Sequence, residues 1–237
     1  MKIVICGARG RMGRRITALA RERGLEVVAG IENEGHPDVD KTVEGVKITS
    51  DLECIKECDC IIDFSRPEAT ERCLGYASKY GKNMVIGTTG LDERVEKKIK
   101  EASSSTGIVY SPNMSIGVNV LFRLIKIAAS VLKNYRAEVG EAHHIHKKDA
   151  PSGTAKRIAQ LINGEGIKLG IDEIKAVRED EIVGDHEVRL ESDVDTLTLK
   201  HSAKTRDIFA KGALEAAGWL SGKDKGLYSM DDVLFNS

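Results

Sequence analysis

Short apolar runs alternate with amphipathic stretches through the first half of the chain. After Cys6, the residues Ile16, Leu19 and Ala20 fall on one helical face, and farther along Val95 does so with Ile99. The apolar runs are typical of buried parallel strands and predict five of them, at Lys2–Cys6, Glu26–Ile31, Cys58–Phe64, Asn83–Gly87 and Gly107–Ser111. Repeated strand–helix–strand units join parallel strands through right-handed crossovers, so the pattern predicts a Rossmann-type, doubly wound α/β sheet.

The segment Ser65-Arg66-Pro67-Glu68 separates the third of these strands from the next helical stripe. A serine followed three residues later by a glutamate resembles a capping box, and proline suits the first turn of a helix. A helix is therefore expected to begin here, with Ala69, Cys73 and Ala77 on its buried face.

The alternation stops at Ser111-Pro112-Asn113, and a different pattern follows. One long apolar helix is expected to about Asn134. After it come strand candidates at Arg136–His144, Ile174–Val177, His186–Glu191 and Asp195–Ser202, and helix candidates at Ser152–Asn163 and Arg206–Leu220. Successive strands without helices between them indicate an antiparallel or mixed sheet. The pattern thus predicts a second, α+β domain on a mixed sheet, with a boundary near residue 113.

The overall charge limits the partners that the chain can attract. Its 237 residues carry 36 basic and 37 acidic side chains, and the net charge of −1 gives no electrostatic reason to expect nucleic acid or an anionic membrane. Gly7 interrupts the N-terminal apolar run too early for a signal peptide, and Arg123 and Lys126 interrupt the most apolar long segment. A cytoplasmic protein is expected, in which any anionic ligand is held by a local cluster of positive charge.

Five cysteines are present, and their odd number in a cytoplasmic setting speaks against a disulfide framework. Cys54, Cys58 and Cys60 are near enough in sequence to suggest a metal cluster. Their spacing matches no usual zinc pattern, however, and no histidine lies near them. We expect these three residues, with Cys6 and Cys73, to be buried thiols.

The loop Gly7-Ala8-Arg9-Gly10-Arg11-Met12-Gly13 joins the first predicted strand to the first predicted helix. Glycines there let the backbone turn tightly and approach a diphosphate, while the helix N-terminus directs amide groups at it. Glu32, at the end of the second strand, can accept hydrogen bonds from an adenosine ribose. The context favours a dinucleotide site, although a tight turn followed by a surface acid would give the same pattern.

Two further loops follow the carboxyl ends of later strands, where ligands of open α/β sheets sit. They are Gly87-Thr88-Thr89-Gly90 and Ser111-Pro112-Asn113. Each is a candidate ligand contact, and each has the composition of a simple turn.

The segment from Glu141 to Thr154, EAHHIHKKDAPSGT, carries most of the candidate chemistry. It contains three histidines and two lysines just before an expected helix start, a combination suited to binding a carboxylate. A histidine is also the usual proton donor near neutral pH. A solvated basic loop, or a metal site made by His143, His144 and His146, remains an alternative. Because neighbours on a strand point to opposite faces, His143 and His144 can share a pocket only if the strand ends there.

Several motifs together resemble the 4-hydroxy-tetrahydrodipicolinate reductase family, also called dihydrodipicolinate reductase. They are GARGRMG, DFSRPE, VIGTTG, SPNMSIGVNV, EAHHIHKKDAPSGTA and WLSGKDKGLYSMDDVL, and they extend over nearly the whole chain. The resemblance implies that a nicotinamide hydride reduces C4 of a small cyclic imine dicarboxylate, with loss of water, in diaminopimelate and lysine biosynthesis. It also implies that the last residues, 218–237, return to the dinucleotide-binding domain of residues 1–113, leaving 114–217 for substrate binding and oligomerisation.

The resemblance assigns roles to individual positions. It implies that His143 is the proton donor and Lys147 the second catalytic residue, and that the substrate-binding residues are His144, Ser152, Gly153 and Thr154. The implied cofactor contacts are Gly7, Ala8, Arg9, Gly10, Arg11, Met12, Glu32, Gly87, Thr88, Thr89, Ser111, Pro112, Asn113 and Met114. No metal is implied.

The chain departs from the family pattern at the position after Glu32. Some members carry a basic residue there for the phosphate of NADP, whereas this chain has Asn33, and the stretch from Glu32 to Ile48 is compact. Glu32 favours the free ribose hydroxyl of NADH, but Arg9 and Arg11 are able to reach a 2′-phosphate. Both NADH and NADPH are therefore expected to serve.

A homotetramer assembled through the second domain is the expected oligomer. Val188 and Leu190 alternate with polar residues, as do Leu197 and Leu199, so a sheet covered on one face would leave an apolar face for a partner. The alternative is a monomer in which the helices at Gly117–Asn134 and Arg206–Leu220 cover both faces.

Three other functions share parts of the pattern. An aspartate- or homoserine-type dehydrogenase has the Rossmann start and a mixed-sheet second domain but does not require the motif around His143. A nucleotide-sensing module would keep the glycine loop and need neither His143 nor Lys147. A metal hydrolase would use the three histidines and would contain metal when purified.

Overall fold

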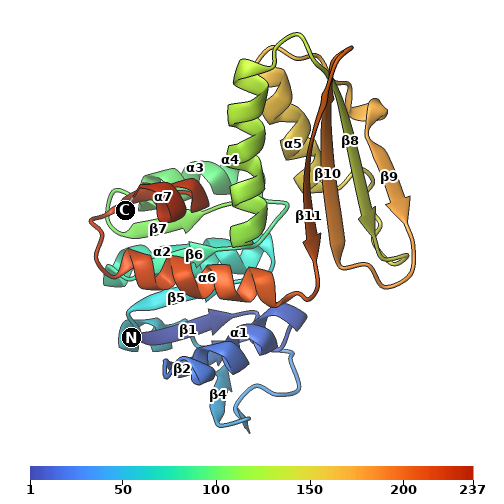
Figure 1. Cartoon of the computed structure of the whole chain (residues 1–237). Coiled ribbons are helices and arrows are strands. Elements are labelled where there is room, and N and C mark those ends of the chain that lie inside the picture. Colours follow the sequence, from blue (N-terminus) through green and yellow to red (C-terminus); the bar gives the residue numbers. More distant parts are fainter. Residues whose placement is uncertain (237) are drawn as a thin grey trace. The chain divides into compact units, whose positions relative to one another are not determined.

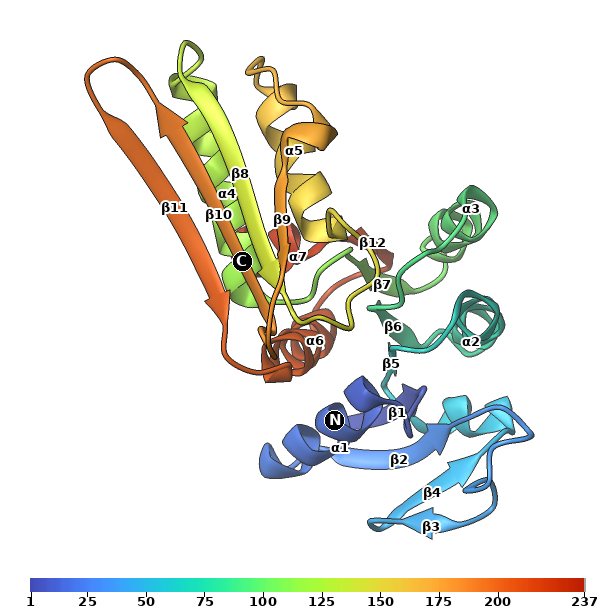
Figure 2. The ribbon, with the colours of Figure 1, turned by 90° about the vertical axis from the view of Figure 1, so that its right-hand side faces the viewer.

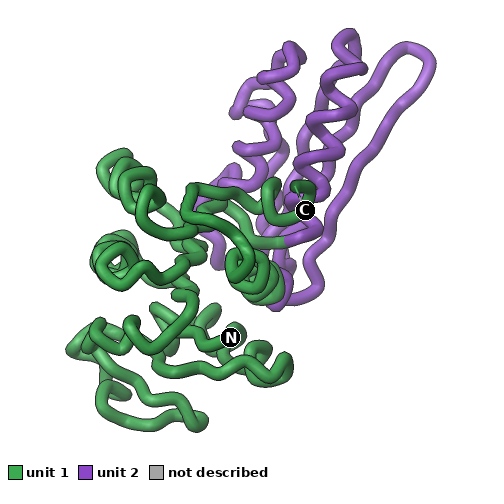
Figure 3. Tube along the Cα trace, turned by 90° about the vertical axis from the view of Figure 1, so that its left-hand side faces the viewer, with its two compact units in different colours: residues 1–115, 209–237 green, residues 116–208 purple. Residues whose placement is uncertain are grey.

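The computed structural model describes residues 1–236, and the chain divides into two compact units, shown in green and purple in Figure 3. Unit 1 comprises Met1–Ser115 and the segment from Phe209 onward, and unit 2 comprises Ile116–Ile208. The family resemblance implied a return to the first domain after residue 217. The structure divides the chain earlier because Ala210, Ala213 and Ala217 belong to the core of unit 1.

Unit 1 is built on one eight-stranded sheet, with strand order β12-β7-β6-β5-β1-β2-β4-β3 (Figures 1 and 2). Its strands are β1 Lys2–Cys6, β2 Glu26–Ile31, β3 Thr42–Val43, β4 Val46–Thr49, β5 Cys60–Asp63, β6 Asn83–Ile86, β7 Gly107–Tyr110 and β12 Gly226–Tyr228. Every neighbouring pair is parallel except β3 and β4. The predicted doubly wound parallel sheet is confirmed.

Helices cover both faces of this sheet. They are α1 Arg11–Glu22, the 3₁₀ helix η1 Leu52–Glu57, α2 Pro67–Tyr80, α3 Glu93–Ala102, α6 Asp207–Leu220 and α7 Met230–Phe235. Because strand residues alternate between faces, Ile3 and Ile5 pack in one core with α1 and α6, while Val4 and Cys6 pack in the other with α2 and α3. The strand order reverses beside β1, which places the loop after β1 at the switch point where such sheets bind ligands.

The start of α2 differs from the expected capping box. The helix begins at Pro67 with Arg66 in the capping position, and no side chain of the described residues caps it. The hydroxyl of Ser65 donates instead to the buried carboxylate of Asp63. The prediction was wrong because the Ser65 hydroxyl binds the Asp63 carboxylate at the end of β5 rather than a backbone N–H in the first turn of α2.

The buried cysteines lie in the cores of unit 1. Cys58 and Cys60 are 0% and 1% exposed, and burial raises the pKa of the Cys58 thiol to about 12. Cys54 is half-buried, and burial raises its pKa to about 11. Cys6 and Cys73 are packed together, with their sulfur atoms 3.2 Å apart, and all five cysteines are free thiols.

Unit 2 contains a four-stranded sheet in the order β11-β10-β8-β9. Its elements are α4 Ile116–Val131, β8 Arg136–His143, α5 Gly153–Gly164, η2 Ile171–Glu173, β9 Lys175–Arg178, β10 Gly184–Glu191 and β11 Thr196–Ala203. β8 and β9 are parallel and the other neighbours antiparallel, so the predicted mixed sheet is confirmed.

Three of the four apolar positions proposed for a subunit interface lie in or against the core of unit 2 instead, and the fourth, Leu197, is 37% exposed. Val188 and Leu190 are 0% exposed and share a core with residues of α4 and α5, and Leu199 packs against that core. The opposite face of the sheet carries charged residues, with Arg136 and Arg189 both paired to Glu191. The alternation in sequence therefore marks the helix-covered face, and an interface on the open face would be polar.

None of the described helices is long and apolar enough to cross a membrane.

Candidate cofactor and active sites

The glycine loop of unit 1 requires its glycines. Gly7 has a φ of 75°, and a Cβ atom there would lie 2.6 Å from the carbonyl oxygen of Phe64. A Cβ on Gly13 would lie 2.2 Å from the carbonyl oxygen of Gly7, so α1 starts in direct contact with the loop. Gly10 occupies the capping position of α1, and no side chain of residues 1–236 caps it. The first amides of the helix are thus suited to the oxygens of a diphosphate, and the loop fits a dinucleotide.

Glu32 closes the end of β2 beside this loop. Its Oε1 accepts the backbone N–H of Arg9 at 2.7 Å, which fixes the carboxylate next to the glycines. The Nε of Arg9 in turn donates to Oδ2 of Asp38, also at 2.7 Å. Glu32 therefore lies beside the glycine loop, and its contact with an adenosine ribose stays a prediction.

A cavity of about 530 Å³ opens over this edge of the sheet. Its walls include four of the predicted cofactor residues, Gly7, Arg9, Gly10 and Glu32. They also include residues that the sequence did not assign to a cofactor, among them His36, Phe64, Ser65, Arg66 and Arg72. The predicted residues Ala8, Arg11, Met12, Gly87, Thr88, Thr89, Ser111, Pro112, Asn113 and Met114 do not line it. Its volume lies within the usual range of ligand pockets.

Asp63 ties two loops of this edge together and was missed in the sequence. It is 0% exposed at the end of β5, where the hydroxyls of Ser65 and Thr70 donate to it and that of Thr88 donates at 3.0 Å. The backbone N–H of Ser65 also donates to the Thr88 hydroxyl, at 2.9 Å. Burial raises the pKa of the Asp63 carboxyl, and these donors oppose that rise. A polar residue closing a buried strand was the signal that could have identified it.

The two later loops differ in accessibility. A Cβ on Gly87 would lie 2.3 Å from the ring of Phe64, so this glycine allows the loop to approach the DFSRPE segment closely. Ser111 and Met114 are only 6% and 2% exposed, and Met114 is a core residue. The exposed positions that remain for a ligand are Thr89 and Pro112.

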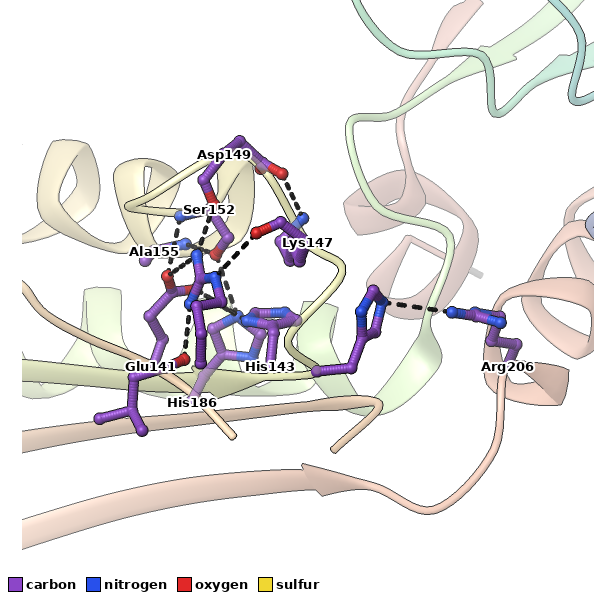
Figure 4. Close-up of polar contacts among 11 residues, drawn as sticks. Glu141, His143, Lys147, Asp149, Ser152, Ala155, His186 and Arg206 are labelled. Atoms are coloured by element: carbon purple, nitrogen blue, oxygen red, sulfur yellow. Dashed lines mark hydrogen bonds and ion pairs between the residues drawn. The ribbon is translucent and has the colours of Figure 1, made fainter. Parts of the chain in front are cut away.

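Unit 2 has a cluster of buried polar side chains on the same face of its sheet as the apolar core. Ala137 and Val139 of β8 are buried, and the next inward positions on the same strand are Glu141 and His143. His186 stands opposite Glu141 in the neighbouring strand β10. Figure 4 shows Glu141 and His143 pointing toward Ser152, where α5 begins.

Glu141 is the centre of this cluster, with a side chain that is 0% exposed. Its Oε1 accepts the backbone N–H of Ser152 at 3.1 Å and the guanidinium of Arg178 at 2.8 Å. Its Oε2 lies 3.0 Å from Nδ1 of His143 and 3.9 Å from Nε2 of His186. The His143 contact is an ion-pair contact rather than an aligned hydrogen bond.

Burial and the neighbouring groups determine the protonation states of Glu141 and His186. Burial alone would raise the pKa of the Glu141 carboxyl, but His143, the Ser152 amide and Arg178 together hold that pKa well below its usual range. Burial, followed by the nearby His143, lowers the pKa of His186 to about 4. At neutral pH the cluster therefore contains an ionised Glu141 and a neutral His186.

Lys147 lies on the loop between β8 and α5, with a side chain that is 24% exposed. Its Nζ is 2.8 Å from Oδ1 of Asp149. Arg178 donates to the backbone carbonyls of both loop residues, to that of Lys147 at 3.3 Å and to that of Asp149. Arg178, a residue that the sequence did not single out, thereby fixes the loop to the sheet.

The three histidines of the motif do not converge. His143 faces inward because it continues the alternation of β8, whereas Nε2 of His144, the next residue, lies 3.3 Å from the guanidinium of Arg206. His146 is exposed. In the described part of the chain, the group whose ligand atoms do converge, within 4.8 Å of one another, is Glu141, His143 and His186. The Arg178 cation in contact with Glu141 opposes a metal ion there.

The start of α5 contains the three remaining predicted substrate residues. Ser152 is 2% exposed, and its hydroxyl accepts the N–H of Ala155 at 3.2 Å, so it caps the helix. Gly153 is exposed, and nothing lies within 4 Å of where its Cβ would be. Thr154 is half-buried in the first turn. Beside the Lys147 loop, this helix start can bind an anion such as a carboxylate.

Comparison with known proteins identifies relatives over almost the whole chain. The sequence profile "Dihydrodipicolinate reductase, N-terminus" matches residues 1–114, and the C-terminal profile matches residues 117–234. A 4-hydroxy-tetrahydrodipicolinate reductase from Aquifex aeolicus is 41% identical, with 99% of this chain and 98% of that protein covered.

Solved structures show the same fold. A dipicolinate-bound dihydrodipicolinate reductase from Paenisporosarcina sp. TG-14 superposes with a TM-score of 0.83 at 22% identity, covering 97% of each chain. An aspartate dehydrogenase from Thermotoga maritima has a TM-score of 0.57 at 15% identity, covering 94% of this chain and 98% of that one. The second likeness explains why the dehydrogenase alternative shares the general architecture.

Proposed function

The chain belongs to the dihydrodipicolinate reductase family, and from that premise we propose that it reduces 4-hydroxy-tetrahydrodipicolinate to tetrahydrodipicolinate with NADH or NADPH. This reaction is a step of diaminopimelate and lysine biosynthesis. Ring C4 gains a hydride, the 4-hydroxyl group leaves as water, and one proton is consumed. The observation that carries the proposal is the buried Glu141–His143 pair beside the Lys147 loop and the start of α5.

Residues of unit 1 hold the dinucleotide in this proposal. The glycine loop and the first amides of α1 receive the diphosphate, and Glu32 accepts from the adenosine ribose. When bound, the reduced nicotinamide supplies the hydride. Asp63 acts as a positioning residue, because its hydrogen bonds fix Ser65 and Thr88 at the edge where the cofactor binds.

Residues of unit 2 hold the substrate in this proposal. Its two carboxylates are best bound by positively charged groups and N–H donors. Lys147 can provide that charge, and His144 and the amides at the start of α5 can add hydrogen bonds. Binding a carboxylate at Lys147 replaces its contact with Asp149, so this lysine exchanges an internal partner for the substrate. Arg178 keeps the loop in place during that exchange, through the backbone carbonyls of Lys147 and Asp149.

His143 supplies the proton in this proposal. Reduction at C4 places electron density at the imine end of the ring, where a nearby acid can deliver a proton. Glu141 lies 3.0 Å from Nδ1 and holds the ring in one orientation, which leaves Nε2 as the atom that exchanges the proton. Lys147 stabilises negative charge during the same step.

Finer points of the function are part of the same proposal. Both NADH and NADPH serve, no metal takes part, the assembly is a homotetramer and the protein works in the cytoplasm. Glu32 beside the glycine loop supports the use of NADH, and the Arg178 cation at the point where metal ligands would converge supports a reaction without metal.

A spectrophotometric assay tests the proposal. Purified protein should oxidise NADH when freshly made 4-hydroxy-tetrahydrodipicolinate is added, and the rate should saturate with that substrate. Aspartate and homoserine should produce no turnover of NAD⁺. Oxidation of aspartate, or no NADH oxidation with the cyclic substrate, would overturn the assignment.

A further inference from the structure

Arg9 is held on two sides in the structure, although it belongs to the loop that would meet the cofactor. Its backbone N–H donates to Glu32, the proposed ribose partner, and its Nε donates to Oδ2 of Asp38 at 2.7 Å. The side chains of Arg9 and Asp38 are only 14% and 25% exposed. The guanidinium is therefore fixed by a charged partner close to the carboxylate that marks the ribose.

Asp38 reaches this position because the segment after Glu32 folds into consecutive turns. The N–H of His36 donates to the carbonyl of Asn33, and that of Asp38 donates to Nδ1 of His36 at 3.2 Å. The N–H of Lys41 then donates back to the carbonyl of Asp38. These turns return the chain to the glycine loop, so the aspartate is part of a defined structure rather than of a loose surface loop.

The charges around the cavity explain how the Arg9–Asp38 pair would affect a bound phosphate. Near the proposed ribose position the cavity walls include Arg9, His36 and the carboxylate of Glu32, and the rest of the lining includes the charged residues Arg66, Glu68 and Arg72. The Arg9 guanidinium holds the pKa of Asp38 below its ordinary value, so the aspartate is ionised at neutral pH. A 2′-phosphate beside Glu32 would thus meet that carboxylate and an arginine that is already paired with Asp38.

We propose that Asp38 sets the choice between the two nicotinamide cofactors, favouring NADH by occupying the guanidinium of Arg9 that a 2′-phosphate would otherwise bind. This role rests on the proposed function, because it takes the cavity as the adenosine end of a nicotinamide dinucleotide. A 2′-phosphate in NADPH has to share the Arg9 guanidinium, whose Nε is held by Asp38, and it then lies close to the Asp38 carboxylate, which repels it. NADH leaves the pair intact.

Calorimetric binding of 2′,5′-ADP and of 5′-AMP isolates the 2′-phosphate without any catalytic step. Asp38→Asn should tighten the binding of 2′,5′-ADP about fivefold or more, because one half-buried charge pair is released. The binding of 5′-AMP should change less than about twofold. The same ratio should appear in the dissociation constants of NADPH and NADH, measured by the fluorescence of the bound cofactor.

Two further variants separate this role from general effects of charge. Glu34→Gln removes one negative charge from the same segment at an exposed position and should leave both affinities unchanged. Arg9→Ala combined with Asp38→Asn should abolish the gain for 2′,5′-ADP, because the freed guanidinium is then absent.

Equal changes for the two nucleotides in Asp38→Asn, or a gain that survives loss of Arg9, would overturn the role of Asp38. The reductase assay is read separately. If the Asp38 variant changes the nucleotide preference while the cyclic imine is not reduced, the proposed reaction fails and the role of Asp38 stands. If the substrate is turned over and the preference is unaltered, the role of Asp38 fails and the proposed reaction stands.

Discussion

The two units of this chain build their candidate sites in different ways. In unit 1 the site is made by the backbone: Gly7 and Gly13 bring the loop after β1, the end of β5 and the start of α1 within contact distance. In unit 2 the site is made by side chains, because the buried carboxylate of Glu141 contacts the Ser152 amide, Arg178 and two histidines. The first arrangement suits a constant ligand such as a dinucleotide, and the second suits a charged substrate that must exchange a proton.

This difference implies that binding and chemistry can be damaged separately. Backbone changes in the glycine loop should weaken cofactor binding, whereas side-chain changes in the Glu141 cluster should slow turnover and leave cofactor binding intact.

Removing the proposed catalytic side chains should have the largest effect on turnover. His143→Ala or Lys147→Ala should each lower kcat by on the order of 10²-fold or more, because the proton donor or the stabilising charge is lost. Steady-state kinetics give kcat, and fluorescence titration should give an unchanged dissociation constant for NADH. A folded variant that lacks both side chains and turns over at nearly the normal rate would remove these residues from the mechanism.

Crowding the glycine loop should weaken cofactor binding, which the previous variants should leave unchanged. Gly13→Ala places a methyl group 2.2 Å from the carbonyl oxygen of Gly7, so α1 must move away from the loop. The dissociation constant for NADH should rise about thirtyfold, as overpacking of a tight contact costs about 2 kcal/mol. The matched control is Gly75→Ala in α2, where nothing lies within 4 Å of the new atom and binding should not change. An unchanged affinity in Gly13→Ala would show that the loop does not depend on this close approach.

A smaller disturbance of turnover is expected from crowding His143. A Cβ on Gly184 would lie 3.0 Å from Nε2 of His143, so Gly184→Ala should displace the ring by a few tenths of an ångström. We expect kcat to fall about tenfold, in view of the sensitivity of proton transfer to geometry. Gly140→Ala, in the neighbouring strand with open space at its Cβ, should leave kcat unchanged. Equal kinetics in both variants would argue that Nε2 does not exchange the proton.

The smallest effect concerns stability and pH. His186 is neutral in the folded protein, with a pKa of about 4 against an ordinary value of 6.5, so the unfolded chain binds the extra proton between these values. Its stabilising contribution is present above pH 6.5 and is lost as the pH falls toward 4. Between pH 6.5 and 5.5 this residue should cost about 1 kcal/mol of unfolding free energy.

Urea unfolding at several pH values measures that loss. His186→Asn should make the dependence of stability on pH shallower in this window, and part of it should remain because burial also lowers the pKa values of His144 and His201. Above pH 7 the titration of His186 contributes nothing to the difference between variant and parent. An identical slope in the variant would mean that His186 is not kept neutral by the fold.

The sequence predicted those parts of the fold that repeat with a clear period. The limits of β1 and β2 agree with the prediction, and the strands expected at Cys58–Phe64 and Asn83–Gly87 are shorter in the structure. The missed strands are short: β3, β4 and β12 have two, four and three residues, and the missed helix α7 has six. β4 and β12 pair in parallel with β2 and β7, partners that no local pattern identifies, whereas β3 forms a short local hairpin with β4.

The sites were predictable where they depend on a local segment. The glycine loop and the His143–Lys147 segment are continuous in sequence, and both were located from it. Arg178 and His186 lie on other strands, and only the register of β8, β9 and β10 brings them to Glu141. Asp38 reaches Arg9 through a series of turns that leaves no periodic signal. Residues of this kind emerge only from the folded chain.

Transfer of deuterium from the cofactor to the product is the sharpest test of the proposed reaction. NADH labelled with deuterium on one face of nicotinamide C4 is incubated with the protein and freshly made 4-hydroxy-tetrahydrodipicolinate, and the product is analysed by mass spectrometry. One of the two labelled forms should give tetrahydrodipicolinate with a single deuterium at ring C4, and the variant lacking His143 and Lys147 should form that product at least about 10²-fold more slowly. Oxidation of NADH without deuterium in the product, or no label transferred from either form, would contradict the proposed hydride transfer.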